Sequence, residues 1–195
     1  MRVARWSRRT VSPADWQASN VPEGKWGVGL DAIPQGLPFV GRVRAYVEGL
    51  RANIEAGMGL ILWGPYRGGK SCVAAAAVGE AMAHGLEPYW IDAFDVADAS
   101  ISRSCWRRDN MRGAPLLVLD DLGMESQDER RGEFPREKIR ALLKYRLERL
   151  RPVVITTNMS LAEVRKVYGD KTWALLQEYT DDVLVKGAED HWRRK

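Results

Sequence analysis

A glycine-rich loop joins a short apolar run to an alanine-rich stretch, and this junction limits the folds open to the chain. The apolar run covers residues 60–63, and the alanine-rich stretch covers residues 71–84, just before Gly85. Four apolar residues between turn signals are typical of a buried strand. The longer stretch predicts a helix that ends with a glycine in the C′ position. We therefore expect a strand, a tight loop and a helix in succession.

The loop has the spacing of a phosphate-binding loop. Glycines let backbone N–H groups converge on one concavity, and the following helix directs its positive end to the same point. A lysine then reaches the β- and γ-phosphates of a nucleotide, and a serine hydroxyl is a ligand for Mg²⁺. The pattern predicts ATP and Mg²⁺ as cofactors, bound by Gly64, Pro65, Tyr66, Arg67, Gly68, Gly69, Lys70 and Ser71. For Arg67, phosphate contact and exposure to solvent both remain open.

The alternation of apolar runs and helical patterns continues along the chain. The segment 1–35 has three prolines and no sustained period, so we expect an irregular arm there. Over residues 36–195, nearly uninterrupted apolar strands alternate with helices, which predicts a parallel sheet buried on both faces. The expected fold is α/β with five parallel strands. Strands are predicted at 60–63, 89–91, 116–119, 153–156 and 183–185, and helices at 39–56, 71–84, 135–150 and after a capping box at Ser160.

Two of the predicted strands end in polar side chains. The third runs into Asp120 and Asp121, and the fourth is followed by Asn158. Doubly wound sheets bind ligands outside the carboxyl ends of their strands. We expect Asp120 to hold Mg²⁺ together with Ser71, and Asp121 to orient or deprotonate an attacking water. Asn158 is expected to hold that water or the γ-phosphate, and its alternative role is to cap the turn into the next helix.

Arginine is concentrated in three segments of a chain whose net charge is only +4. They are residues 2–9, residues 103–112 and the last three residues, which are two arginines and a lysine. Arginines neutralise phosphates, and an indole stacks on a base. A nucleic-acid contact is therefore predicted for Arg103, Trp106, Arg107, Arg108 and Arg112. A solvated helix face with Trp106 in the core fits the same pattern equally well.

Composition excludes several classes of protein. No stretch approaches 18 consecutive apolar residues, so we expect neither a transmembrane helix nor a membrane partner. The basic start is not followed by an apolar stretch, which argues against a secretory signal. Two cysteines are too few for a disulfide framework, and their spacing matches no zinc pattern. A cytoplasmic location is therefore predicted.

Together, these motifs resemble the AAA+ ATPases of the DnaC-type helicase loaders and their relatives, the IstB-type transposition helpers. The likeness covers about residues 36–194 and includes Leu-Asp-Asp-Leu-Gly and Ile-Thr-Thr-Asn. It implies that Lys70 and Ser71 are the Walker A residues, that Asp120 and Asp121 are the Walker B pair, and that Asn158 is sensor 1. The catalytic set is then Lys70, Asp121, Asn158 and Arg193, the last as sensor 2 on the γ-phosphate. A charged tail is the alternative interpretation of Arg193.

The resemblance also implies partners and two departures. It implies a homo-oligomer in the ATP state around single- or double-stranded DNA, with a replicative helicase or a transposase as the recruited protein. The loaders carry a helicase-gripping domain where only about 35 residues precede the ATPase domain here. Their arginine finger corresponds to Leu175, for which Arg165 or Lys171 are possible substitutes.

Three functions are therefore open. The first is a DNA-associated assembly factor that binds and hydrolyses ATP. The second is a nucleotide-gated adaptor with little intrinsic hydrolysis, which the leucine at the finger position supports. The third, a small-molecule kinase, is disfavoured by the Asp-Asp pair and by the extra strand between the two nucleotide motifs. DNA-stimulated ATP turnover separates the first two, and phosphate transfer to a metabolite would indicate the third.

Overall fold

The computed structural model describes residues 8–101, 105–124 and 133–187. Five strands form one sheet in the order β2-β3-β4-β1-β5, and each neighbouring pair is parallel. The predicted α/β fold with a five-stranded parallel sheet is therefore confirmed. The strands are β1 (Gly59–Trp63), β2 (Tyr89–Asp92), β3 (Leu117–Leu122), β4 (Val153–Thr157) and β5 (Thr180–Leu184).

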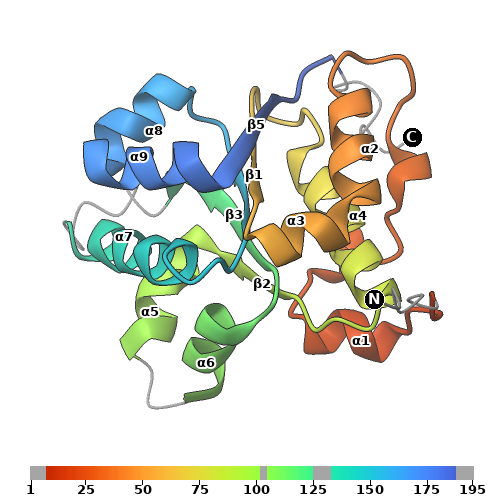
Figure 1. Cartoon of the computed structure of the whole chain (residues 1–195), viewed down its shortest axis with the longest axis horizontal. Helices are drawn as coiled ribbons and strands as arrows, with labels where there is room; N and C mark the ends of the chain where they lie inside the picture. Colours follow the sequence, from red (N-terminus) through yellow and green to blue (C-terminus); the bar gives the residue numbers. More distant parts are fainter. Residues whose placement is uncertain (1–7, 102–104, 125–132, 188–195) are drawn as a thin grey trace.

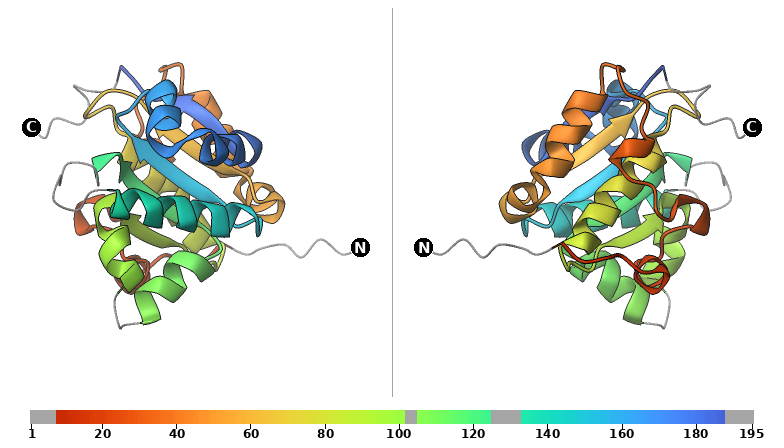
Figure 2. Two further views of the ribbon diagram at one scale, coloured as in Figure 1. Left: turned by 90° about the vertical axis from the view of Figure 1, so that its left-hand side faces the viewer. Right: turned by 90° about the vertical axis from the view of Figure 1, so that its right-hand side faces the viewer.

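Helices cover both faces of the sheet and make a three-layer sandwich (Figure 1). One face carries α1 (Pro13–Ala18), α2 (Val40–Glu48), α3 (Leu50–Ala56) and α4 (Lys70–Ala83). The other carries the helices that Figure 2 shows grouped together on one side of the molecule. They are α5 (Val96–Ile101), α6 (Cys105–Gly113), α7 (Phe134–Leu147), α8 (Leu161–Tyr168) and α9 (Asp170–Tyr179).

Each face of the sheet buries its own apolar cluster. Val154 of β4 packs in the cluster beneath α2 and α4, and its neighbour Ile155 packs in the cluster beneath α7 and α9. This alternation follows from the two-residue period of a strand. It explains why the strands have nearly uninterrupted apolar sequences, because both sets of side chains are buried. Within the described part of the chain, no helix has both the length and the apolar character needed to cross a membrane.

The N-terminal segment is packed into the domain core. It contains α1 and two short 3-10 helices, η1 (Glu23–Lys25) and η2 (Leu30–Ala32). Its buried side chains Trp16, Val21 and Ile33 join the cluster beneath α4. Gly79 permits this contact, because a β-carbon there would lie 3.1 Å from the indole of Trp16. The segment that the sequence predicts to be an irregular arm is thus held by apolar contacts.

The same segment covers the edge of the sheet formed by β2. β2 is an edge strand, and edge strands present unpaired backbone groups to other chains. Here the N–H of Trp90 donates to the carbonyl of Ser19 at 2.9 Å, and the side-chain amide of Asn20 donates to the carbonyl of Trp90 at 2.8 Å. The N-terminal segment therefore satisfies part of this edge within the chain.

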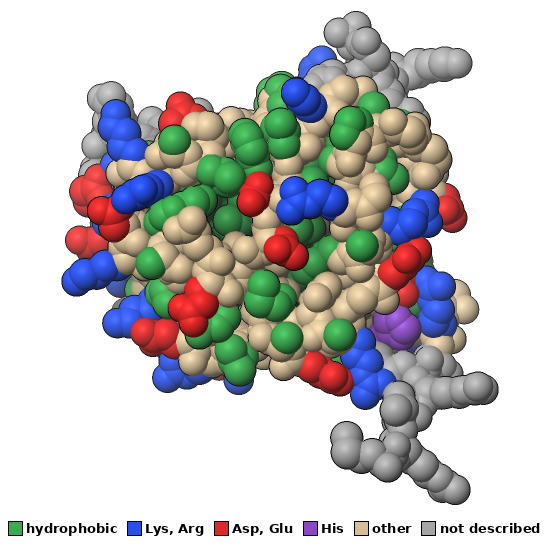
Figure 3. Space-filling view, turned by 45° about the horizontal axis from the view of Figure 1, so that its top comes forward, with side chains coloured by type: hydrophobic (Ala, Val, Ile, Leu, Met, Phe, Trp, Pro, Cys, Tyr) green, Lys and Arg blue, Asp and Glu red, His purple; other side chains and the backbone are tan. Residues whose placement is uncertain are grey.

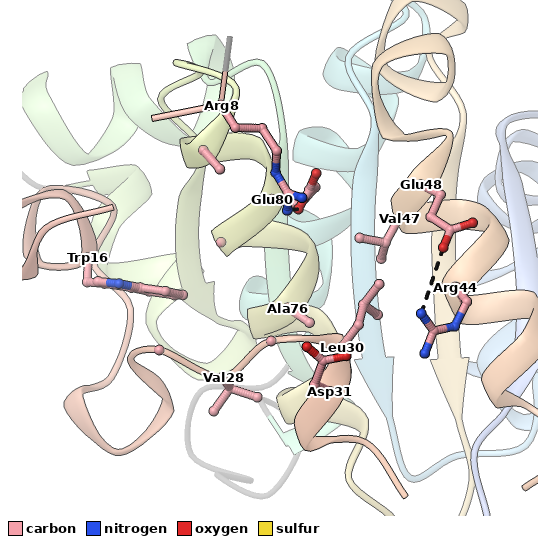
Figure 4. Close-up of a pocket in the computed structure, with 14 residues that line it drawn as sticks. Arg8, Trp16, Val28, Leu30, Asp31, Arg44, Val47, Glu48, Ala76 and Glu80 are labelled. Carbon is pink, nitrogen blue, oxygen red and sulfur yellow. Dashed lines mark hydrogen bonds and ion pairs between the residues drawn. The ribbon is translucent and has the colours of Figure 1, made fainter. Parts of the chain in front are cut away.

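A pocket of about 390 Å³ lies between this segment, α2 and α4 (Figure 4). Its walls include Val28, Leu30 and Val47, and ion pairs lie among its lining residues. Arg8 of the N-terminal segment contacts Glu80 of α4 there, whereas the 3.8 Å pair of Arg44 and Glu48 lies within α2. Exposed pairs of this kind add about 0–1 kcal/mol. The apolar contacts therefore contribute most of the energy that holds the segment in place.

Two predicted elements differ in the structure. The single helix predicted at 39–56 is wrong, because Gly49 ends α2 and begins α3. Glycine has the least favourable helix propensity after proline, and the side-chain amide of Asn53 donates to the carbonyl of Tyr46 at 2.9 Å across the break. β5 begins at Thr180 rather than at 183, since an edge strand tolerates an exposed residue such as Asp181.

A fully buried arginine connects three elements at the amino end of the sheet. The guanidinium of Arg146 in α7 donates to the carbonyls of Met111 at 2.8 Å, Ala114 at 2.9 Å and Pro152 at 2.9 Å. These carbonyls belong to α6 and to the residues just before β3 and β4. Burial, followed by the charge of Arg151, lowers the pKa of Arg146 to about 9.

We expect Arg146→Leu to lower the free energy of unfolding by about 3 kcal/mol or more. The variant would leave the buried carbonyls of Met111 and Ala114 without their side-chain donor, at about 1–3 kcal/mol each, whereas Pro152 keeps the N–H of Leu117 at 3.3 Å. Chemical denaturation measures the change. Lys144→Leu on the same helix is the control, because its exposed side chain makes only a 3.8 Å pair with Glu148. Equal losses in the two variants would contradict the structural role given to Arg146.

Candidate functional site

The glycine-rich loop lies at the carboxyl end of β1 and closes against the end of β5. Gly64 has φ +140°, and a β-carbon there would meet the carbonyl oxygen of Val185 at 2.4 Å. Gly68 approaches the same oxygen, and its N–H donates to the carbonyl of Pro65 at 3.2 Å. No described side chain caps the following helix at Gly69. The loop therefore combines a tight backbone turn with an uncapped helix N-terminus, which suits an anion.

The side chain of Lys70 is buried beneath this loop. Its Nζ donates to the carbonyls of Gly64 at 3.1 Å and Pro65 at 2.8 Å, and to Oδ1 of Asn158 at 2.7 Å. These three partners of the ammonium group are neutral oxygens at the carboxyl ends of β1 and β4. An anionic group in the loop would offer it a stronger partner, because charge-assisted hydrogen bonds are roughly twice as strong as neutral ones.

The tip of the loop is exposed. Tyr66 is 74% exposed, and the guanidinium of Arg67 lies 5.8 Å from the centre of its ring. Arg67 has φ +62°, a left-handed conformation that costs a non-glycine residue on the order of 1 kcal/mol. The side chain of Arg67 is exposed.

The acidic pair lies in a β-bulge at the end of β3. Leu119 is opposite Ile155 and Leu122 is opposite Thr157, so β3 has one extra residue between these positions. Asp121 is in the left-handed region, with φ +54°. A bulge interrupts the alternation of side chains between the two faces of a sheet and changes the directions in which they point.

Thr156 of β4 joins the two aspartates. Its hydroxyl donates to Oδ1 of Asp120 at 2.5 Å and accepts the N–H of Asp121 at 2.9 Å. Thr156 is fully buried, so this geometry is fixed by the core. The sequence shows a threonine at the end of an apolar strand, but its role appears only when the two strands are placed side by side.

Burial raises the pKa of Asp120, and the charge of Asp121 adds to this effect. Hydrogen bonds from Thr156 and Ser71 oppose it. Asp92 lies opposite Asp120 in the sheet, and its pKa is also raised by burial and by nearby acids that include Asp120 and Asp121. Carboxylates whose charged form is disfavoured in this way gain from a bound cation. Ser71 and Asp120 thus offer oxygen ligands in a setting that favours a cation.

Asn158 points to Lys70 and does not cap the turn that follows β4. The turn is capped by the hydroxyl of Thr157, which accepts the N–H of Met159 at 3.1 Å. The next helix has its own capping box, formed by Ser160 and Glu163. The alternative role for Asn158 as a turn cap is therefore wrong.

An apolar pocket of about 590 Å³ adjoins the loop. It was not predicted from the sequence, because its walls come from three segments that share no local motif. They are the start of α2, the loop and the end of β5. The lining residues are Leu37, Pro38, Phe39, Arg42, Pro65, Val183, Leu184, Lys186 and Gly187.

Solved structures share this architecture, although no protein-family model and no curated protein matches the sequence. The crystal structure of the DnaC helicase loader has a TM-score of 0.71 and 25% identity, over 85% of this chain and 100% of that chain. DnaI has a TM-score of 0.68 and 19% identity, over 86% and 92% of the two chains. AMPPCP-bound DnaA from Aquifex aeolicus has a TM-score of 0.63 and 16% identity, over 82% and 50%.

This chain has the AAA+ fold of the DnaC-type helicase loaders. The resemblance drawn from the sequence is confirmed at the level of the fold. In this AAA+ sheet, β4 lies between β1 and β3, so Asn158 is positioned between the glycine-rich loop and the acidic pair. On the face shown in Figure 3, basic and acidic side chains are mixed, with hydrophobic side chains gathered between them.

The basic segment of the AAA+ domain lies on α6, far from the loop. Trp106 is 54% exposed and packs edge-on against Tyr89, with ring centres 5.8 Å apart, so the interpretation that places Trp106 in the core is wrong. Arg107 and Arg112 are exposed, and Arg108 is half-buried. α6 leads to the amino end of β3, whereas the loop lies at the carboxyl end of β1. Arg103 and Arg193 lie outside the described residues.

Leu175 lies on α9, where the resemblance implies an arginine finger. It is half-buried against the apolar cluster beneath α7, and its neighbour Leu176 is fully buried. Of the two suggested substitutes, Arg165 is 2.6 Å from Asp170 of its own chain, and Lys171 is exposed. Leu175 thus packs as an ordinary apolar residue of the helix.

Proposed function

We propose that this chain is an ATP-dependent assembly factor that acts on DNA, in the manner of a helicase loader. The observation that carries the proposal is the meeting of Lys70, Ser71, Asp120 and Asn158 at the carboxyl ends of three strands. Lys70 Nζ is 2.7 Å from Oδ1 of Asn158, and the Ser71 hydroxyl opposes the rise in the pKa of Asp120 that burial causes. The DnaC protein, 25% identical to this chain, is a helicase loader, which supports the assembly role.

The glycine-rich loop is proposed to bind the triphosphate, and the apolar pocket is proposed to bind the base. Pro65 belongs to both, so one nucleotide can occupy the two regions together. Lys70 would exchange its carbonyl partners for the β- and γ-phosphates. The pocket is lined mainly by aliphatic side chains, with the ring of Phe39 among them, which suits the flat face of a base.

Ser71 and Asp120 fit Mg²⁺, which prefers oxygen ligands. In nucleotide sites this ion is bound by one or two protein oxygens, by phosphates and by water. The described residues contain no cluster of three or more His, Cys, Asp or Glu side chains placed for a metal. When bound, Mg²⁺ would neutralise charge on the phosphates.

For hydrolysis, we assign Asp121 and Asn158 the role of holding the attacking water. Asp121 accepts a proton from the water as its oxygen bonds to the γ-phosphorus, and the bond from that phosphorus to the β–γ bridging oxygen breaks. ADP leaves and phosphate is released. Arg193 is proposed as a further charge on the γ-phosphate. The ATP state is proposed to assemble copies of the chain on DNA, with a replicative helicase or a transposase as the recruited partner.

Leu175 favours a second candidate, a nucleotide-gated adaptor that binds ATP and hydrolyses it slowly. An arginine finger contributes about 10³–10⁵ in turnover where P-loop enzymes have one. A chain with leucine at that position depends on an arginine from elsewhere, either from Arg165 of a neighbouring copy or from a partner protein. Turnover in the presence of DNA separates the two candidates.

We expect DNA affinity to fall steeply with salt, with a log–log slope of about −0.7 per phosphate contacted on a single strand. Arg107→Ala combined with Arg108→Ala should make this slope less negative by about 1.4, which fluorescence anisotropy at several salt concentrations measures. Arg44→Ala combined with Arg51→Ala removes the same charge from α2 and α3 on the other face of the sheet. If the α6 variant and this control have the same slope, the DNA contact does not include Arg107 and Arg108.

A further inference from the structure

A second group of basic side chains lies where α7 ends, beside the end of α6. The ring of Tyr145 is flanked by two guanidinium groups, that of Arg149 at 4.1 Å and that of Arg112 at 5.0 Å from its centre. Arg151 donates to the backbone carbonyl of Arg112 at 2.5 Å. We call Arg112, Tyr145, Arg149 and Arg151 the arginine cluster. It joins α6, α7 and the turn before β4, and only Arg112 belongs to the basic segment seen in the sequence.

The positive charge of this arginine cluster is not compensated within the described part of the chain. None of its three arginines has a carboxylate within 4.0 Å there, unlike Arg136 and Arg140 of α7, which pair with Glu133. Arginines this close repel one another, so a bound anion would stabilise the arrangement.

A further buried charge lies behind the arginine cluster. The Nη groups of Arg146 donate to carbonyls of α6 and of the residues before β3 and β4. Among the described residues, Arg146 pairs with no carboxylate. The charge of Arg151 contributes to the lowered pKa of Arg146. Because Arg146 fixes α6 against α7, the spacing of the exposed guanidinium groups is set by the core and not by flexible side chains alone. Preorganised guanidinium groups suit phosphate, which they contact in a bidentate way.

The exposed indole of Trp106 on α6 indicates which class of polyanion binds here. Trp106 is exposed and precedes Arg112 by six residues on α6, which places it about 9 Å along the helix and about 120° around its axis, on the side that faces Tyr89. Single-stranded nucleic acid binds where phosphate-neutralising charges lie beside an aromatic ring on which a base stacks.

We propose that the arginine cluster binds the phosphate backbone of a single-stranded nucleic acid. The strand runs from Trp106 over the end of α7. This inference rests on the proposed association with DNA and specifies the surface used. It adds Arg149 and Arg151, which the sequence pattern does not single out. The path lies at the amino ends of β3 and β4, whose carboxyl ends carry Asp120 and Asn158.

The test is the salt dependence of binding to an oligothymidine, by fluorescence anisotropy, for Arg149→Ala combined with Arg151→Ala. The slope should become less negative by about 1.4 for two lost contacts, and affinity at 0.1 M salt should fall on the order of tenfold. Arg149→Lys combined with Arg151→Lys keeps the charge and should keep the slope. The control Arg44→Ala with Arg51→Ala should match the unmodified chain, and thermal unfolding verifies that each variant is folded.

Three outcomes would overturn the inference. An alanine variant with the slope of the control, while the Arg107 and Arg108 variant is impaired, would reject the arginine cluster and leave the DNA contact on α6 intact. Absence of oligothymidine binding by the unmodified chain would reject the proposed association with DNA itself. Displacement of oligothymidine by polyglutamate at equal charge concentration would show that the arginine cluster binds an acidic protein.

Discussion

Replacing Lys70 with alanine is expected to lower the affinity for ATP at least a hundredfold. Two charge-assisted hydrogen bonds to the phosphates would be lost, at about 1.5–3 kcal/mol each. A difference of about 1.4 kcal/mol corresponds to a tenfold change in affinity, so the loss is on the order of 10²–10⁴. Isothermal titration calorimetry with ATP and Mg²⁺ measures this change.

Lys166→Ala is the matched control, because Lys166 is an exposed lysine on α8. The buried position of Lys70 requires a separate check of folding, since alanine removes the donor that Lys70 offers to Oδ1 of Asn158 and to the carbonyls of Gly64 and Pro65. A thermal unfolding curve provides it. A folded Lys70→Ala variant with unchanged ATP affinity would mean that the glycine-rich loop does not bind phosphate.

Asp121→Asn is expected to retain ATP binding within a few-fold and to reduce turnover by about 10²–10⁴, the usual contribution of general acid–base catalysis. Asparagine suits this position because it tolerates the left-handed conformation that Asp121 adopts at φ +54°. The N–H at 121 can still donate to Thr156. The substitution therefore removes the basic carboxylate and preserves the backbone of the bulge.

Steady-state phosphate release and calorimetry together measure the two quantities for Asp121→Asn. The control is Asp181→Asn, which changes an exposed aspartate on the edge strand β5. Turnover by the Asp121→Asn variant at the rate of the unmodified chain would exclude Asp121 as the base. A loss of ATP affinity equal to the loss of turnover would assign Asp121 to binding instead.

Local patterns were sufficient to predict the sheet and the loop. A strand followed by a phosphate-loop pattern and a helix is specified within about 25 residues, and the polar ends of β3 and β4 follow from apolar runs that stop abruptly. Parallel strands bring their carboxyl ends to one edge, so the proximity of Lys70, Asp120 and Asn158 could be expected from the sequence.

Contacts between distant segments could not be predicted in this way. Thr156 joins the aspartates only because β3 and β4 are neighbours with a bulge between them. The apolar pocket needs three segments, and the packing of Trp16 depends on a glycine at position 79. The arginine cluster likewise depends on where α7 ends. Each of these features is set by tertiary packing, for which a single sequence has no periodic signal.

The break at Gly49 shows a different limit. The apolar residues of 39–56 keep a helical spacing on both sides of the glycine, so periodicity alone predicts one helix. The structure uses the glycine and the amide of Asn53 to end α2 and begin α3. A glycine within a helical pattern lowers the reliability of the pattern, but it does not by itself determine where the chain turns.

The most direct test of the proposed function is the steady-state rate of ATP hydrolysis by the purified chain, with and without single-stranded DNA. We predict turnover that DNA increases and that Lys70→Ala abolishes in both conditions. ATP binding with negligible turnover in both conditions would favour the nucleotide-gated adaptor. A rate that DNA leaves unchanged would contradict the claim that this chain couples ATP to assembly on DNA.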